Sequence, residues 1–98
     1  MGEWIDLKAA DGFELKAWRS APKGEAKGAV VVIQEIFGVN HHMRTVCARF
    51  AAQGYAVVAP ALFDRAERGV ELGYGPDDVA RGRELRGQIA DRDVMLDV

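Results

Sequence analysis

The sequence predicts an α/β fold, in which an antiparallel hairpin leads into a parallel sheet with flanking helices. Three observations support this fold class. Two alternating segments are separated by the tight-turn pair Asp11-Gly12. Residues 28–34 (GAVVVIQ) form a continuous apolar run, as strands covered on both faces do. A strand, helix, strand succession then follows with short links, which predicts a right-handed crossover and parallel pairing.

The hairpin is expected from residues 3–8 and 13–19. Both segments alternate apolar and polar side chains, which is typical of strands with one buried face. The segment 20–27 is polar and contains a proline and a glycine, so we expect an exposed loop there.

A helix is expected over residues 41–53, after a loop that ends at Asn40. Asn40 is suited to be the N-cap, and Gly54 is suited to end the helix. Residues 55–59 (YAVVA) predict a second buried strand, which Pro60 ends. The apolar residues of the helix recur at the spacing of one helical face: Met43, Val46, Cys47, Phe50 and Ala51.

The last third of the chain predicts a loop over residues 61–75 and one helix that begins near Pro76. Proline is favoured in the first helical turn, and the two aspartates that follow it complement the helix dipole. We expect Asp91 and Asp93 to lie on a solvated face of this helix. Its pattern reaches residue 98 without a stop signal, so the chain is expected to stop in mid-pattern.

Composition excludes several classes of function. A length of 98 residues fits one small domain, and 49% hydrophobic residues are enough to build a core. The 13 basic and 15 acidic residues give a net charge of -2, so no nucleic-acid or membrane surface is expected. With no signal peptide or apolar span, a cytoplasmic protein is expected. No glycine-rich phosphate turn follows residues 28–34, so no cofactor is expected.

Glu35 is the first candidate for a functional role. It follows a predicted buried strand, and function gathers at the carboxyl ends of parallel strands. Its neighbours Ile33, Ile36 and Phe37 are apolar and favour burial, which is costly for a carboxylate without a partner or a task. The alternative is a solvated loop carboxylate or a structural ion pair.

The residues around Glu35 resemble a known signature. Residues 34–40 (QEIFGVN), followed by Met43-Arg44, are similar to the motif of the dienelactone hydrolase family within the α/β-hydrolase fold. Residues 54–60 (GYAVVAP) and 62–65 (LFDR) support the resemblance, which covers the N-terminal half of the family's domain. One departure is Ala61, where related sequences often carry an aspartate.

The resemblance implies hydrolysis of lactones such as dienelactones, or of carboxylic esters, by a Cys-His-Asp mechanism without a metal. Glu35 would contact the nucleophilic thiol and help to control its ionisation. Ile36 would supply a backbone N–H to the oxyanion hole, and Phe37 would contact the substrate. An arginine of the last helix would hold the substrate carboxylate, with Arg81 as the candidate and Arg83 nearly as good.

The chain carries no Gly-x-Ser/Cys-x-Gly elbow, so residues 1–98 are expected to be a single partial domain without the nucleophile, aspartate and histidine. Cys47 lies on the apolar stripe of a helix, which predicts a buried structural thiol. His41 and His42 are adjacent, so their side chains diverge. They are expected at the helix start or the cleft rim, and not as metal ligands.

Three hypotheses remain open at this stage. The chain is the N-terminal portion of a dienelactone-hydrolase-like enzyme, pairing with a C-terminal half that lies beyond Val98. Alternatively, it is a non-catalytic half-domain that associates with itself or with a partner through open sheet edges. The third is a portion of a serine esterase of the same fold. Without a thiol partner, Glu35 would be exposed, paired with Arg44 or Arg65, or protonated.

Overall fold

The hairpin predicted from the sequence is formed by β1 (Gly2–Lys8) and β2 (Glu14–Ser20) in the computed structural model, which describes residues 2–98. The turn between them uses Gly12 with a positive φ of 91°. Asp11 supports the turn, because its Oδ1 accepts a hydrogen bond from the N–H of Phe13 over 3.1 Å. This confirms the hairpin and its turn.

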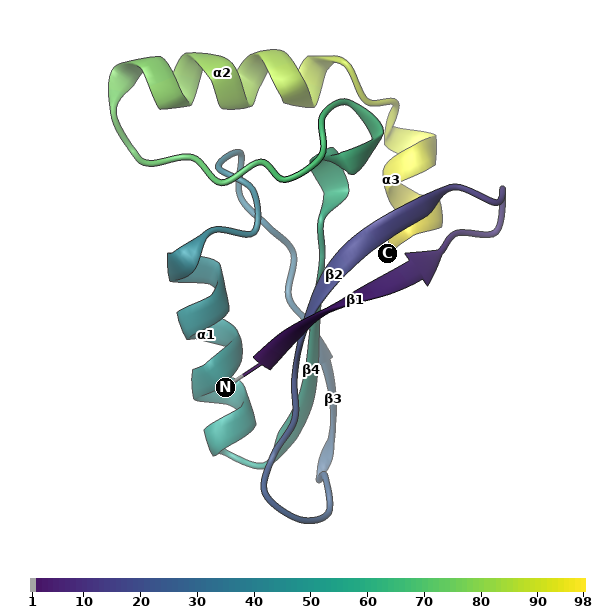
Figure 1. Cartoon of the computed structure of the whole chain (residues 1–98), viewed down its shortest axis with the longest axis vertical. Helices are drawn as coiled ribbons and strands as arrows, with labels where there is room; N and C mark the ends of the chain where they lie inside the picture. Colours follow the sequence, from purple (N-terminus) through teal and green to yellow (C-terminus); the bar gives the residue numbers. More distant parts are fainter. Residues whose placement is uncertain (1) are drawn as a thin grey trace.

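The sheet has four strands in the order β1-β2-β4-β3 (Figure 1). After β3 (Gly28–Val31) the chain forms α1 (His41–Ala52) and returns as β4 (Tyr55–Pro60). β4 runs antiparallel to β2 and parallel to β3, with Val30 opposite Val57. The predicted parallel pair is therefore confirmed. β3 is an edge strand, and its outer side pairs with no other strand of residues 2–98.

α1 covers one face of this sheet (Figure 1). Its N-cap is Asn40, whose Oδ1 accepts from the N–H of Met43 over 3.1 Å, and Gly54 follows the helix with a φ of 100°. Both predicted helix ends are confirmed. The core between helix and sheet consists of buried apolar side chains: Val32, Val39, Met43, Cys47, Ala51, Val57 and Ala59.

The prediction for the first buried strand is partly wrong. β3 ends at Val31 and does not continue to Gln34. Val31 and Ile33 are 45% and 49% exposed, so this strand is not covered on both faces. The reason is that α1 packs on the face that carries Val32, and no other element of residues 2–98 covers the opposite face.

Two predictions for the last third of the chain are also corrected. The expected loop contains a 3₁₀ helix, η1 (Leu62–Arg65), and the expected single helix is two: α2 (Pro76–Gly87) and α3 (Asp91–Asp97). The break follows Gly87, a poor helix former, and lets Ile89 pack inward. We call residues 62–97 the cap. Its apolar cluster consists of Phe63, Leu85 and Ile89.

The cap lies over the end of the sheet at which β3 and β4 finish. α2 crosses this end, and α3 lies near the turn of the β1–β2 hairpin (Figure 1). None of the helices within residues 2–98 has the length and apolar character needed to cross a bilayer.

Candidate active site

The candidate site is built on a turn at the carboxyl end of β3. The turn runs from Glu35 to Gly38, and the N–H of Gly38 donates to the carbonyl oxygen of Glu35 over 3.2 Å. Gly38 has a φ of 80°, which favours glycine. A Cβ at this position would also overlap the carbonyl oxygen of Val70. The local sequence therefore requires glycine here, for conformation and for space.

The turn is held from two sides by segments that are distant in sequence. The N–H of Leu72 donates to the carbonyl oxygen of Phe37 over 2.8 Å. On the other side, α2 approaches through Gly82, where a Cβ would overlap the carbonyl oxygen of Ile36. Gly82 is buried, so its lack of a side chain is what allows α2 to pack directly on the turn. The turn has little freedom to rotate.

The backbone N–H of Ile36 is the group predicted to serve an oxyanion hole. In a trans peptide the N–H points away from the carbonyl oxygen of the preceding residue, here Glu35. That oxygen accepts from Gly38 N and from Nε2 of Gln34, each over 3.2 Å. Within residues 2–98, the N–H of Ile36 donates to no backbone or side-chain acceptor. A fixed peptide with a free N–H is the geometry that an oxyanion donor needs.

A cavity of about 250 Å³ lies beside this peptide. Such concave, mainly apolar sites with a few polar groups are typical of small-molecule binding. It is lined by side chains from the strand end, η1 and the cap: Ile33, Gln34, Glu35, Ile36, Leu62, Phe63, Arg86, Ile89 and Val94.

Glu35 is among the residues that line this cavity. Glu35 is exposed, so the burial expected from its apolar neighbours is wrong in this chain. Glu35 was expected to be exposed, paired with an arginine, or protonated. It is exposed, and it forms no ion pair within residues 2–98. Arg44 pairs with Glu71 over 2.5 Å, and Arg65 pairs with other aspartates. Ile33 is exposed because no other element of residues 2–98 covers this side chain.

The two predicted substrate-binding residues, Arg81 and Phe37, do not line this cavity. Arg81 pairs with Glu67 and Glu84 and is not among the residues that line the cavity. Arg83, the second choice, is exposed. The arginine that does line the cavity is Arg86, which sequence reasoning missed. Its Nη1 donates to the carbonyl oxygen of Ile89 over 2.9 Å.

Phe37 and His42 both meet the ring of Tyr74, and none of these three residues lines the cavity. The rings of Phe37 and Tyr74 meet edge to face at 4.4 Å between centroids, and His42 meets Tyr74 at 6.4 Å. His41 and His42 are the first two residues of α1 and are exposed, as predicted. Within residues 2–98, no three His, Cys, Asp or Glu side chains are grouped so that they could hold a metal ion.

Cys47 is buried in the core between α1 and the sheet, which confirms its structural interpretation. Its relative exposure is 0%. Burial raises the pKa of the Cys47 thiol above its ordinary value, because the thiolate would lose its hydration. A neutral buried thiol is a poor nucleophile, and Cys47 belongs to the core and not to the site.

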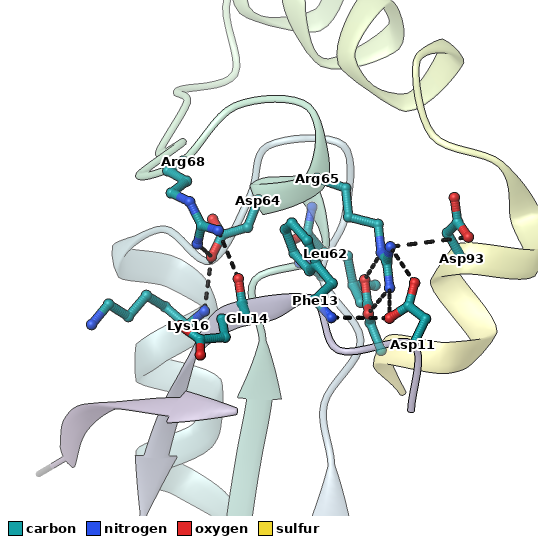
Figure 2. Close-up of polar contacts among 11 residues, drawn as sticks. Asp11, Phe13, Glu14, Lys16, Leu62, Asp64, Arg65, Arg68 and Asp93 are labelled. Carbon is teal, nitrogen blue, oxygen red and sulfur yellow. Dashed lines mark hydrogen bonds and ion pairs between the residues drawn. The ribbon is translucent and has the colours of Figure 1, made fainter. Parts of the chain in front are cut away.

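An ion-pair cluster around Arg65 anchors the cap, and sequence analysis did not foresee it. The guanidinium binds Asp97 through Nε and Nη2, both over 2.8 Å, and Asp11 over 2.9 and 3.1 Å. It also lies over the ring of Phe13, and Asp93 is 4.0 Å away (Figure 2). The side chain of Asp93 is 33% exposed, so the solvation expected for it is only partial.

Charge within this cluster shifts the pKa of its members. Asp97 and Asp11 raise the pKa of Arg65, so the guanidinium stays charged. The hydrogen bond from Arg65 lowers the pKa of Asp11. Asp91, by contrast, is exposed as predicted and pairs with Arg86.

A second buried carboxylate ties η1 to the hairpin. The side chain of Asp64 is 2% exposed, and its Oδ2 accepts from the backbone N–H of Lys16 over 2.8 Å (Figure 2). Arg68 lies 3.6 Å from the same oxygen. Together with Arg65, this contact fixes the segment that follows β4, and so fixes one wall of the cavity.

Comparison with known proteins decides the family. The sequence model of the dienelactone hydrolase family matches residues 15–97. The chain belongs to this family. A Synechocystis sp. protein named as a candidate carboxymethylenebutenolidase is 45% identical over 69 residues, which are 70% of this chain and 28% of that protein. The carboxymethylenebutenolidase of Pseudomonas putida is 37% identical over 70 residues, 71% of this chain and 30% of that protein.

Solved structures agree with the family assignment. A candidate dienelactone hydrolase from Klebsiella pneumoniae has a TM-score of 0.72 and 30% identity, over 99% of this chain and 40% of that one. The chain is therefore an N-terminal portion of the α/β-hydrolase fold of dienelactone hydrolases, and it spans well under half the length of these relatives. The predicted fold class and family are confirmed.

Proposed function

We propose that residues 1–98 supply the oxyanion loop of an enzyme that hydrolyses small lactones or carboxylic esters. The observation that carries this proposal is the free N–H of Ile36, held in a fixed peptide beside a cavity. Glu35, which lines that cavity, would contact the thiol of the nucleophile, and Phe37 would contact the substrate. The name of the Pseudomonas putida relative, a carboxymethylenebutenolidase, supports the class of reaction.

The remaining catalytic residues would come from a further segment that carries a Cys-His-Asp set. The free outer edge of β3 supports this, because another strand can pair there and bring its carboxyl end beside Ile36. The Klebsiella structure, of which this chain covers 40%, has the additional length. We also propose a cytoplasmic location, which fluorescence microscopy of the tagged protein would test.

The test is an enzyme in which residues 1–98 are joined to the part of the Synechocystis protein beyond its matched segment. We call it the joined enzyme. It should hydrolyse an activated ester, and Glu35→Gln should change the rate or shift its pH profile, because a neighbouring carboxylate affects ionisation of the thiol. Glu25→Gln, in the exposed loop before β3, is the matched control. A pH profile indifferent to Glu35→Gln would exclude the role given to Glu35.

Arg81 stays our candidate for binding the substrate carboxylate, although Arg86 lines the cavity. Arg81 would have to leave Glu67 and Glu84 to reach a substrate. In the joined enzyme, Arg81→Gln should raise KM for an anionic ester about 10-fold, since a charged hydrogen bond is lost. KM for a neutral ester should stay unchanged. If Arg86→Gln produces this pattern and Arg81→Gln does not, the assignment moves to Arg86.

A second candidate function is self-association of a non-catalytic half-domain. The exposed side chains of Val31 and Ile33 and the free edge of β3 favour it. Sedimentation of the 98-residue chain decides between the two, because a monomer with a cooperative melting transition argues against association. One observation distinguishes a serine esterase from the proposed enzyme with a cysteine nucleophile, namely whether the elbow that completes the fold carries Gly-x-Ser or Gly-x-Cys.

A further inference from the structure

Gln34, the residue before Glu35, makes two hydrogen bonds through one side-chain amide. Its Oε1 accepts from the backbone N–H of Leu62 over 2.9 Å. Its Nε2 donates to the carbonyl oxygen of Glu35 over 3.2 Å. The two partners lie at the ends of neighbouring parallel strands, since Leu62 follows β4 and Glu35 follows β3. The side chain therefore bridges the two strand ends directly beneath the turn.

The chemistry of the two partners fixes the orientation of the amide. Leu62 offers an N–H, which needs an oxygen, and Glu35 offers a carbonyl oxygen, which needs an N–H. A flipped amide would set oxygen against oxygen and N–H against N–H. Glutamine is thus suited to this position, because it provides one acceptor and one donor on a planar group of the required length.

We propose that Gln34 is the positioning residue of the oxyanion donor. By holding the oxygen of Glu35, it sets the plane of the Glu35–Ile36 peptide and aims the Ile36 N–H into the cavity. By binding Leu62, it also fixes the position of this peptide relative to η1, which forms another wall of the same cavity. This inference rests on the proposed function of the Ile36 N–H, and it adds the side chain that directs it.

Gly38 alone does not fix this peptide. Its N–H reaches the same oxygen over 3.2 Å, but this bond lies within the turn. The contacts with Leu72 and Gly82 are made to the carbonyl oxygens of Phe37 and Ile36, not to that of Glu35. Gln34 links the peptide to Leu62 at the start of η1, two residues after the inner strand β4, and so to a segment that the sheet holds in place. An oxyanion donor stabilises developing charge because it is oriented before the reaction. A hydrogen bond that connects the peptide to a segment outside the turn should therefore fix its orientation better than a hydrogen bond within the turn.

The first experiment is NMR on the 98-residue chain and needs no activity. Gln34→Met keeps the length and removes both hydrogen bonds, so the amide signals of Leu62 and Ile36 should shift, and the Leu62 amide should exchange faster with solvent. Gln53→Met, at the exposed end of α1, is the matched control and should leave both signals in place. Unchanged Leu62 and Ile36 signals in Gln34→Met would overturn the bridge.

Gln34→Glu gives a sharper reading in the same spectra. The introduced carboxylate can still accept from Leu62, but it cannot donate to the oxygen of Glu35 until it is protonated. The Ile36 amide should therefore differ from wild type at neutral pH and return towards it as pH falls through about 4, the ordinary range of a glutamic acid. A signal that stays displaced over this range would contradict the proposed donor role.

Activity of the joined enzyme tests the catalytic consequence. Gln34→Met should lower kcat on the order of 10- to 100-fold with little change in KM, less than the 10²- to 10³-fold typical for loss of an oxyanion donor itself. For Gln34→Glu, the ratio of variant to wild-type kcat should rise as pH falls. If the joined enzyme is active and neither substitution changes its kcat, this inference is overturned. A joined enzyme that is inactive with Gln34 in place overturns the proposed function instead, while NMR still decides the bridge.

Discussion

The α1 side of the sheet and the cap are held in place by different interactions. Between α1 and the sheet, seven buried apolar side chains form one continuous core. The apolar cluster of the cap consists of three such side chains, and the cap is tied to the hairpin by the ion pair of Arg65 with Asp11 and by the contacts of Asp64. One region depends on apolar packing, and the other depends on placed charges.

This difference explains how the site is supported. The strand that precedes Glu35 belongs to the packed region, because Val32 is part of its core. The walls opposite Ile36 belong to the cap, through Phe63, Ile89 and Val94. The turn from Glu35 to Gly38, which we propose as the oxyanion loop, therefore lies where the two regions meet. The cap approaches it at Gly82, and Gln34 binds Leu62 of the cap.

The largest expected effect is on the packed side. Met43 is 6% exposed, and Met43→Ala should lower the free energy of unfolding by about 2–5 kcal/mol through lost burial and the cavity left behind. Met95→Ala is the matched control, because Met95 lies in the cap and is 74% exposed. It should change stability by less than about 0.5 kcal/mol. Urea unfolding followed by circular dichroism measures both variants.

Equal destabilisation by the two methionine substitutions would contradict the contrast between the regions. It would mean that α3 buries Met95 in solution, for example against a second copy of the chain. A sedimentation run on each variant separates this case, because only an association that covers Met95 would weaken in Met95→Ala.

The same contrast decides how much could be predicted from the sequence. The hairpin, α1 and the two parallel strands follow from local periodicity and from caps within a few residues, and each was predicted. The loop after the first parallel strand was also predicted, while the role of the Ile36 N–H stays a prediction. The break at Gly87 was missed, since the helical pattern of charged residues continues through it. The inward packing of Ile89 is a tertiary effect.

The contacts of the cap could not be read from local patterns. Arg65 and Asp11 are 54 residues apart in sequence, and Arg65 and Asp97 are 32 apart, so no spacing rule connects them. Arg86 was passed over in favour of Arg81 because a helix register alone does not say which arginine faces a cavity. The burial expected for Glu35 was wrong because the strand before it has one open face.

A smaller effect is expected from acid titration of the Arg65 cluster. Because Arg65 lowers the pKa of Asp11, ionised Asp11 stabilises the fold above its unfolded-state pKa, near 3.8. This contribution should be lost as pH falls below that value, through the lower pKa of the folded state. Asp11→Asn should therefore be less stable than wild type at pH 6, and the difference should shrink towards zero in acid. Urea unfolding at a series of pH values measures it.

The control for this titration is the same substitution without its partner. In an Arg65→Met background, Asp11→Asn should lose its pH-dependent effect, because the hydrogen bond that lowers the pKa of Asp11 is absent. A pH-dependent difference that persists there would assign the shift to the turn itself, where Asp11 accepts from the N–H of Phe13. The cap would then be tied to the hairpin chiefly through Asp64, whose side chain is 2% exposed and accepts from the backbone N–H of Lys16.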